Sequence, residues 1–255
     1  MLGIQQQDQS EQRDGAQAAP VIDERLMELE AQAGLYRLFG RLLEGEVDFE
    51  LLALLRGPLR QPLADAGVVV SPAFFEAPAE ALLEALAEEY TGLMVAPGAM
   101  MPYASVFETG RMFQEPADRA LAAYHEAGWG FRNRLSGEFP DHVGVMLSFY
   151  ALQLQAEQDA LASGAEEEAE AMRTRADRFM VEQLGRWAPG WCRLAATAAL
   201  HPFYQQLLTL IGQLLWEDVC LRVSHRERLK ELAELNNREP PRLDYDADFR
   251  KASGL

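Results

Sequence analysis

Histidine and cysteine, the side chains that most often serve as metal ligands or nucleophiles, are few in this sequence and are scattered along it. The four histidines are His125, His142, His201 and His225. They form no HExxH motif and no pair four residues apart, so no preformed metal site is expected. Cys192 and Cys220 form no CxxC motif, which predicts neither a disulfide framework nor a zinc ribbon. The simplest interpretation is a protein of a reducing compartment.

Motifs for nucleotide chemistry and for hydrolysis are also missing. The sequence has no GxxxxGK[ST] phosphate loop, and the Gly-Trp-Gly run at 128–130 is followed by Asn133 where a dinucleotide fingerprint has its third glycine. It has no GxSxG nucleophile elbow, and the adjacent Asp141 and His142 need a third partner to work as a triad. We therefore expect no enzyme activity, no cofactor and no bound metal.

Two short clusters are candidates for a binding role. Residues 100–107, MMPYASVF, combine soft methionine side chains, a rigid proline and two aromatic residues in a segment expected to be non-helical, a composition suited to gripping apolar peptide side chains. Residues 139–142, FPDH, precede a long apolar stripe. On the residues alone, the 100–107 cluster is more simply a buried loop between helices. Asp141 more simply caps the helix that begins at Val143, with His142 in its first turn.

Helical periodicity dominates the segments that must position these clusters. Apolar stripes at helical spacing run through residues 26–43, 82–93, 143–154 and 203–214, and shorter helices are expected at 49–56, 116–125 and 191–200. A further helix is expected to end within 179–187. Proline and glycine make 62–72 and 97–110 irregular. The β-like run Val68-Val69-Val70 is too short and isolated to support a sheet, so the predicted fold class is all-α.

These segments predict a single globular helical-bundle domain over residues 21–235, with a tail on each side. Residues 1–20 are rich in Gln, Asp and Ala and are expected to be a disordered tail without a signal peptide. Residues 236–255 carry Pro240-Pro241 and alternate aspartate with aromatic residues, which indicates a mobile C-terminal tail. The small and acidic run at 163–170 is expected to form a solvated turn or hinge between two antiparallel helices.

The charge balance narrows the kinds of partner. The chain has 40 acidic and 23 basic residues, a formal net charge of −17, so its surface repels nucleic acid and anionic lipid headgroups. A cationic peptide, such as a targeting segment with adjacent arginines, is attracted instead. The longest stretch without formal charge, 194–216, contains a histidine, a proline and three glutamines, so no membrane-spanning helix is expected. These features favour a cytoplasmic location.

Four segments resemble the TorD/DmsD/NarJ family of molybdoenzyme assembly chaperones. The stretch EYTGLMVAPGAMMPYASVF is similar to the family's pattern of an aromatic residue, an apolar pair, a turn and a Pro-aromatic-x-Ser-Val-aromatic core. EFPDHVGVML resembles its Pro-Asp-His segment at the start of a long helix. FMVEQLGRWAPGW followed by HPFYQQLLTLIGQLL resembles its C-terminal signature. The resemblance extends from about Leu26 to Glu217, in order, and leaves both tails outside.

The resemblance implies an all-helical chaperone that binds the leader or N-terminal region of a molybdopterin oxidoreductase catalytic subunit until its cofactor is inserted and, for an exported enzyme, until twin-arginine export is permitted. In this reading Asp141 and neighbouring carboxylates pair with the client's arginines, and His142 could make binding depend on pH. The residues that match the two motifs are the candidate client-binding residues: Tyr90, Leu93, Pro102, Tyr103, Ser105, Val106, Phe107, Pro140, Asp141 and His142.

Three positions depart from the family pattern and leave the identity of the client open. They are Ala104, Met146 and Gln183, where acidic residues and a histidine are common in the family. Two other functions stay open. One is a non-catalytic helical scaffold subunit of a stable redox complex. The other, less favoured, is a nucleotide hydrolase, which would need a phosphate cradle that the sequence lacks. The family resemblance also allows a monomer or a homodimer that swaps helices through the 163–170 hinge.

Overall fold

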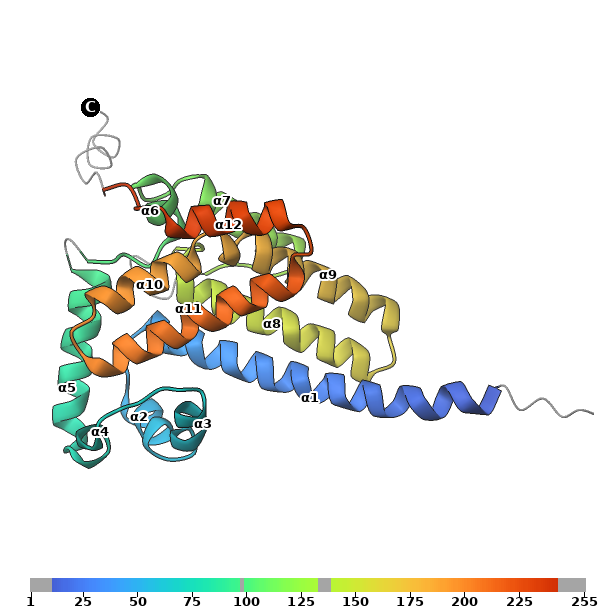
Figure 1. The fold of residues 1–255 in the computed structure, drawn as a ribbon, viewed down its shortest axis with the longest axis horizontal. Coiled ribbons are helices and arrows are strands. Elements are labelled where there is room, and N and C mark those ends of the chain that lie inside the picture. The colour runs from blue at the N-terminus through green and yellow to red at the C-terminus, as the bar shows by residue number, and fades with distance from the viewer. Residues whose placement is uncertain (1–10, 97–98, 133–138, 243–255) are drawn as a thin grey trace, which may run out of the picture.

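The computed structural model describes residues 11–96, 99–132 and 139–242, with side chains described from residue 24 onwards. Its elements are α1 (Glu11–Glu44), α2 (Phe49–Arg56), α3 (Arg60–Asp65), α4 (Pro72–Glu76), α5 (Ala79–Tyr90), the π-helical turn η1 (Thr91–Val95), α6 (Ala104–Thr109), α7 (Glu115–Glu126), α8 (Val143–Ala162), α9 (Glu166–Glu182), the 3₁₀ turn η2 (Leu184–Arg186), α10 (Ala188–Ala198), α11 (Pro202–Arg222) and α12 (Arg226–Asn237). The described residues form no strand, so the all-α prediction is confirmed (Figure 1).

The pairing of α1 with α8 gives the body its long axis (Figure 1). Two glycines bring the two backbones together, because a Cβ atom on Gly144 would lie 2.8 Å from the Glu44 nitrogen and one on Gly40 would lie 3.0 Å from the Gly144 oxygen. Beside this crossing the Ser148 hydroxyl donates a hydrogen bond to the Glu44 carboxylate. Glycine is therefore required on both helices for this close approach.

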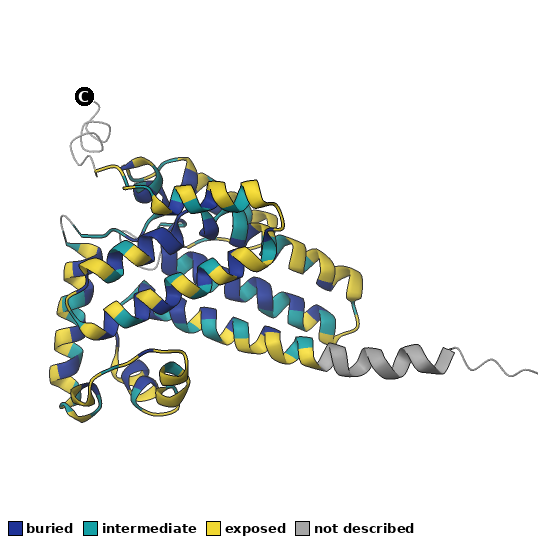
Figure 2. Ribbon diagram, viewed as in Figure 1, coloured by how far each residue is buried: buried dark blue, intermediate teal, exposed yellow. Residues whose placement is uncertain are grey.

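The core is largest where α8, α10 and α11 face the interior, as the buried residues in Figure 2 show. Its largest fully buried side chains include Trp187, Trp191, Tyr150, Tyr204, Phe39 and Phe203. A set of four polar side chains inside this region links three helices. The Tyr36 hydroxyl of α1 donates to Asp218 of α11 at 2.5 Å, and Arg222 of α11 donates to the Tyr150 hydroxyl of α8 at 2.7 Å.

The predicted hinge at 163–170 lies within an αα-hairpin. The turn between α8 and α9 is three residues long, with Gly164 in the left-handed region at φ 75°, and residues 166–170 form the start of α9. The acidic side chains Glu166, Glu167 and Glu168 lie in the first turn of α9. There, negative charge interacts favourably with the positive end of the helix dipole. Phe149 and Phe179 pack edge to face across the hairpin at 4.8 Å between ring centroids.

Several element boundaries differ from the sequence expectation. Helix α3 extends into the 62–72 segment that was expected to be irregular, because Pro62 lies in the first turn of the helix, where its missing amide breaks no helical hydrogen bond. Helix α6 forms inside 97–110, also expected to be non-helical. Helix α1 begins at Glu11 and so includes residues assigned to the N-terminal tail, and α12 extends to Asn237, past the expected boundary at 235. Within the described chain, no helix is long and apolar enough to cross a membrane.

Candidate functional site

The two sequence clusters meet in space through a backbone bridge. Tyr103 and His142 form an isolated antiparallel β-bridge. The Ala104 amide donates to the Asp141 carbonyl at 3.0 Å, and the Val143 amide donates to the Pro102 carbonyl at 2.8 Å. The 100–107 and 139–142 clusters are therefore parts of one structural unit, as a shared site requires.

Asp141 fastens the start of α6 with its side chain as well. Its carboxylate accepts a hydrogen bond from the Ser105 amide at 2.8 Å, in the first turn of α6, a helix that has no side-chain cap from its own N-cap residue Tyr103. Burial raises the pKa of Asp141, and the hydrogen bonds from Ser105 oppose this rise. The expectation that Asp141 caps α8 was wrong, because the carboxylate is directed to the neighbouring helix α6.

His142 is the residue that caps α8. Its Nδ1 accepts a hydrogen bond from the Gly144 amide at 3.1 Å, so the ring is neutral at that nitrogen. Burial lowers the pKa of His142 to about 4. In this conformation His142 is uncharged at physiological pH and does not act as a charge switch there.

Aromatic side chains gather at the outer edge of the bridge. The Tyr103 ring lies edge to face with Phe139 at 5.6 Å and with His142 at 5.2 Å. Phe113, which is 64% exposed and has a left-handed φ of 56°, packs on Phe139 at 4.3 Å. Behind them the Tyr124 hydroxyl donates to the Pro140 carbonyl at 2.5 Å. This edge is apolar and partly open to solvent.

Tyr90 and Leu93 lie where α5 continues into the π-helical turn η1. The Tyr90 hydroxyl donates to the Leu43 carbonyl at 3.2 Å, and burial is the main reason that the pKa of Tyr90 rises to about 12. The Met100 amide donates to the Leu93 carbonyl at 2.9 Å, and Trp191 Nε1 donates to the Met100 carbonyl at 3.0 Å. These two bonds hold the start of the 100–107 cluster against η1 and α10.

Beside this junction is a groove of about 700 Å³, which we call the α5 groove. It is lined by Ala85, Glu88, Glu89, Gly92, Leu93, Ala99, Met100, Ala198, Leu200, His201 and Pro202. Glu88 is exposed, and Glu89 accepts a hydrogen bond from the Leu200 amide at 2.6 Å. The Leu200 side chain is 86% exposed. The groove thus combines two carboxylates with an apolar wall, although Leu93 is the one residue of the ten candidates that lines it.

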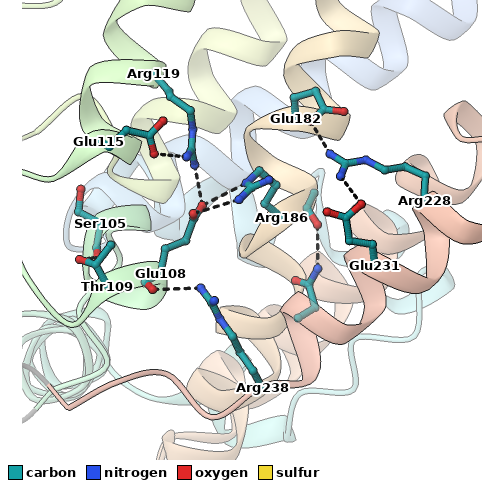
Figure 3. Close-up of polar contacts among 12 residues, drawn as sticks. Ser105, Glu108, Thr109, Glu115, Arg119, Glu182, Arg186, Arg228, Glu231 and Arg238 are labelled. Atoms are coloured by element: carbon teal, nitrogen blue, oxygen red, sulfur yellow. Dashed lines mark hydrogen bonds and ion pairs between the residues drawn. The ribbon is translucent and has the colours of Figure 1, made fainter.

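A second feature that sequence reasoning missed is the ion-pair cluster around Glu108 of α6 (Figure 3). Its carboxylate, with a side chain 9% exposed, accepts from Arg119 of α7 at 2.8 Å and from Arg186 of η2 at 3.4 Å. Arg119 also pairs with Glu115 on its own helix. Because Glu108 and Arg186 are far apart in sequence, no local spacing predicts this cluster. It joins α6, α7 and η2 into one unit.

The burial of the ten candidate residues divides them into two groups. Tyr103, Val106 and Pro140 are partly exposed. The buried members are Tyr90, Leu93, Pro102, Ser105, Phe107, Asp141 and His142. The Asp141 residue is 1% exposed, so in this conformation its carboxylate is not accessible to a ligand arginine. Most of the motif residues are therefore buried and hold the two clusters together, and the accessible surface lies beside them.

The fold and the two joined clusters place the protein in the class of all-helical proteins built on one helical domain. Among the described residues, no three His, Cys, Asp or Glu side chains come together in a way that could hold a metal ion. The sequence profile of the nitrate reductase delta subunit family matches residues 53–193, more than half of the chain, and the chain belongs to that family. This confirms the TorD/DmsD/NarJ resemblance. Members of the family are non-catalytic chaperones of molybdoenzyme maturation, and this family role implies a molybdoenzyme catalytic subunit as partner. No curated protein matches the chain.

Proposed function

We propose that this protein is a cytoplasmic chaperone that binds the leader or N-terminal region of a molybdopterin oxidoreductase catalytic subunit, and that it assists folding, cofactor insertion and, for an exported client, twin-arginine export. The observation that carries the proposal is the α5 groove, where carboxylates and an apolar wall lie beside the family motif. A leader or N-terminal segment with basic and apolar residues has the complementary composition.

The two halves of the groove contribute differently to binding. Glu88 and Glu89 lie near the surface, where each ion pair with a peptide arginine adds about 0.2–1 kcal/mol. The net charge of −17 attracts a cationic peptide over a longer range and speeds its association. Leu93, Met100 and Leu200 offer apolar surface, and burying one leucine or phenylalanine of the peptide there contributes about 1.5–3 kcal/mol. Apolar contacts therefore supply most of the affinity, and the carboxylates contribute to selection.

The buried motif residues have a positioning role in this proposal. The hydrogen bond from the Val143 amide to the Pro102 carbonyl and the one from the Ser105 amide to the Asp141 carboxylate fix the chain that leads from α6 back to Met100. Trp191 holds the Met100 carbonyl from the opposite side. A change in the motif would alter the groove through its wall, without touching the bound peptide.

A charge-matched pair of double variants tests the groove. The probe is a fluorescein-labelled synthetic peptide with two adjacent arginines followed by a leucine-rich stretch, which we call the leader probe, and its Kd is measured by anisotropy. Glu88→Gln with Glu89→Gln should weaken binding about tenfold, as expected for the loss of two surface ion pairs. Glu80→Gln with Glu84→Gln, two exposed carboxylates of α5 outside the groove, makes the same charge change and should leave the Kd nearly unchanged.

Equal losses in both double variants would assign the effect to net charge, and no loss in either would remove the groove from the proposal. A pull-down from the native host at low ionic strength identifies the client. Recovery of an immature molybdoenzyme catalytic subunit is the expected result. Stoichiometric recovery of a mature complex would instead support the scaffold function.

A further inference from the structure

The C-terminal end of α12 is fixed firmly to the rest of the protein. The Asn236 side chain accepts from the Gly190 amide at 2.8 Å and donates to the Gly185 carbonyl at 2.7 Å. A Cβ atom on Gly190 would lie 2.9 Å from the Asn236 Cα, so the two backbones are in direct contact. Arg193 adds a hydrogen bond to the Asn236 carbonyl at 3.1 Å. The chain after α12 therefore starts from a defined place, next to α6.

The residues that follow, Arg238-Glu239-Pro240-Pro241-Arg242, form what we call the C-terminal strap. The Arg238 guanidinium donates to the Glu108 carbonyl at 3.2 Å (Figure 3). It also lies 5.8 Å from the centre of the Phe107 ring. Further along, a Cβ atom on Gly110 would lie 2.8 Å from the Arg242 oxygen and 2.9 Å from the Pro241 Cβ. The strap thus crosses α6 from Phe107 to Gly110.

The strap shares two properties with the basic part of a client segment, because it carries arginine and is extended where it leaves α12. It carries an arginine at each end with one glutamate and two prolines between them, a formal charge of +1, and its backbone is extended at Arg238, with ψ 153°. Gly110 has a left-handed φ of 71° and ends α6 in the surface over which the strap passes. The surface of α6 therefore already accommodates an extended, cationic segment with its backbone in close contact.

The contact between the strap and α6 also leaves one donor unpaired, which lowers the cost of replacing the strap by another segment. Arg238 Nε is buried and has no hydrogen-bond partner among the described residues. A buried donor without a partner is a cost that water would relieve if the strap moved away. Phe107, one of the motif residues, is 2% exposed beneath this arginine. Release of the strap would open Phe107 to a ligand, while Asn236 would still hold α12 in place.

We propose that the α6 surface formed by Phe107, Glu108 and Gly110 is a second peptide-binding surface, specific for extended cationic segments, and that the C-terminal strap occupies it in the free chaperone. This inference rests on the proposed function, because the competitor of the strap is the basic part of the client's N-terminal region. The α5 groove then receives the apolar part of the same segment. A peptide must bind the α6 surface more tightly than the strap does in order to displace it, so a weakly matched peptide is excluded.

Full-length variants with matched charge test the competition. Arg238→Ala removes the contacts to Glu108 and Phe107 and should tighten binding of the leader probe about fivefold or more, mainly through a faster association. Lys230→Ala changes the net charge equally at an exposed site of α12, where Lys230 pairs with Glu234, and should leave the Kd unchanged. Unchanged or weaker binding by Arg238→Ala would overturn the competition.

A second probe separates this inference from the proposed function. It is a labelled synthetic peptide with the sequence of residues 234–242, offered to the wild-type chain and to the Arg238→Ala/Arg242→Ala double variant. The peptide should bind the double variant at least fivefold more tightly than the wild type, because the surface is no longer occupied in cis. If the leader probe binds no variant but the strap peptide does, the proposed function fails and the α6 surface stands. If the strap peptide binds both chains equally, or neither, the α6 surface is rejected.

Discussion

The Asp141 carboxylate accepts a hydrogen bond at 2.8 Å from the amide of Ser105, 36 residues earlier in the chain, and so caps helix α6. The two residues belong to the two sequence clusters, and the bond joins the clusters side chain to backbone where the β-bridge joins them backbone to backbone. An acidic residue at this position is explained by the free amides at the start of α6.

Asp141→Ala should lower the free energy of unfolding by about 1–3 kcal/mol, because it leaves the Ser105 amide buried without an acceptor. Asp141→Asn keeps an acceptor oxygen and should lose less. Urea denaturation measures both, with the exposed Asp118→Ala on α7 as the control. A loss of client binding without loss of stability would contradict the capping role and return Asp141 to the contact surface.

The depressed pKa of His142 predicts a specific loss of stability in acid. Burial lowers the pKa to about 4 from the ordinary 6.5, so between these values the unfolded chain binds a proton that the folded chain does not. Stability should therefore fall as the pH drops from 6.5 to 4, by about 3 kcal/mol from this group.

His142→Asn should remove that part of the pH dependence while keeping a capping side chain on α8. The measurement is the urea midpoint of both chains at a series of pH values from 7 to 4. The two curves should converge as the pH falls, because only the wild type loses the histidine contribution. Parallel curves would show that His142 titrates normally.

The contact between α1 and α8 can be tested with a pair of glycine substitutions. Gly144→Ala places a methyl group 2.8 Å from the Glu44 nitrogen, a backbone atom that cannot move without moving α1, and should destabilise the protein by about 1–3 kcal/mol. Gly34→Ala on α1 meets nothing within 4 Å and should be neutral or stabilise the helix by up to about 1 kcal/mol. Thermal unfolding monitored by circular dichroism measures both. Similar effects in the two variants would mean that the helices are not in close contact.

The ion-pair cluster around Glu108 should contribute more to the free energy of unfolding than a single surface ion pair does. Glu108→Ala leaves Arg119 and Arg186 without their shared carboxylate, and a loss of about 1–3 kcal/mol is expected, since the arginines are about a quarter exposed and water relieves part of the cost. Glu108→Gln should lose less. Glu115→Ala removes the exposed partner of Arg119 and is the control, with an expected change of under about 0.5 kcal/mol. The readout is the urea midpoint, and an equal loss for Glu108→Ala and Glu115→Ala would show that the shared carboxylate has no special role.

The sequence predicted the fold class and the main helices because apolar periodicity records burial directly, as in Leu82, Leu86 and Tyr90 of α5. Short helices were harder. Helix α6 has six residues and no cap of its own, and it depends on Asp141 from a distant segment. A pattern within one segment cannot contain that information.

The candidate site was predictable in its location and less so in the role of each residue. The motif pointed to the junction of α5, α6 and α8, where the structure brings the two clusters together. Exposure separates buried residues such as Ser105 from exposed ones such as Glu88, which we propose as a contact residue, and exposure depends on what packs above each side chain. Asn236 is a clear case, since a polar residue in a proline-rich tail turned out to be 5% exposed and bonded to two turns of the core.

The shape of the α5 groove depends on the number of residues in the π-helical turn η1. A π-helical turn holds about one residue more than a regular turn, so Thr91–Val95 is in effect an insertion at the end of α5. A Cβ atom on Gly92 would have no neighbour within 4 Å, so Gly92 makes no packing contact that its deletion would remove. Deleting it would restore regular winding and rotate the following residues by about 100° around the helix axis. Met100, which lines the groove and whose amide is bonded to the Leu93 carbonyl, would then shift with the turn. Relatives that differ by one residue in this turn would have a differently shaped groove, and, if the groove binds the client as proposed, a single insertion or deletion would change which client fits.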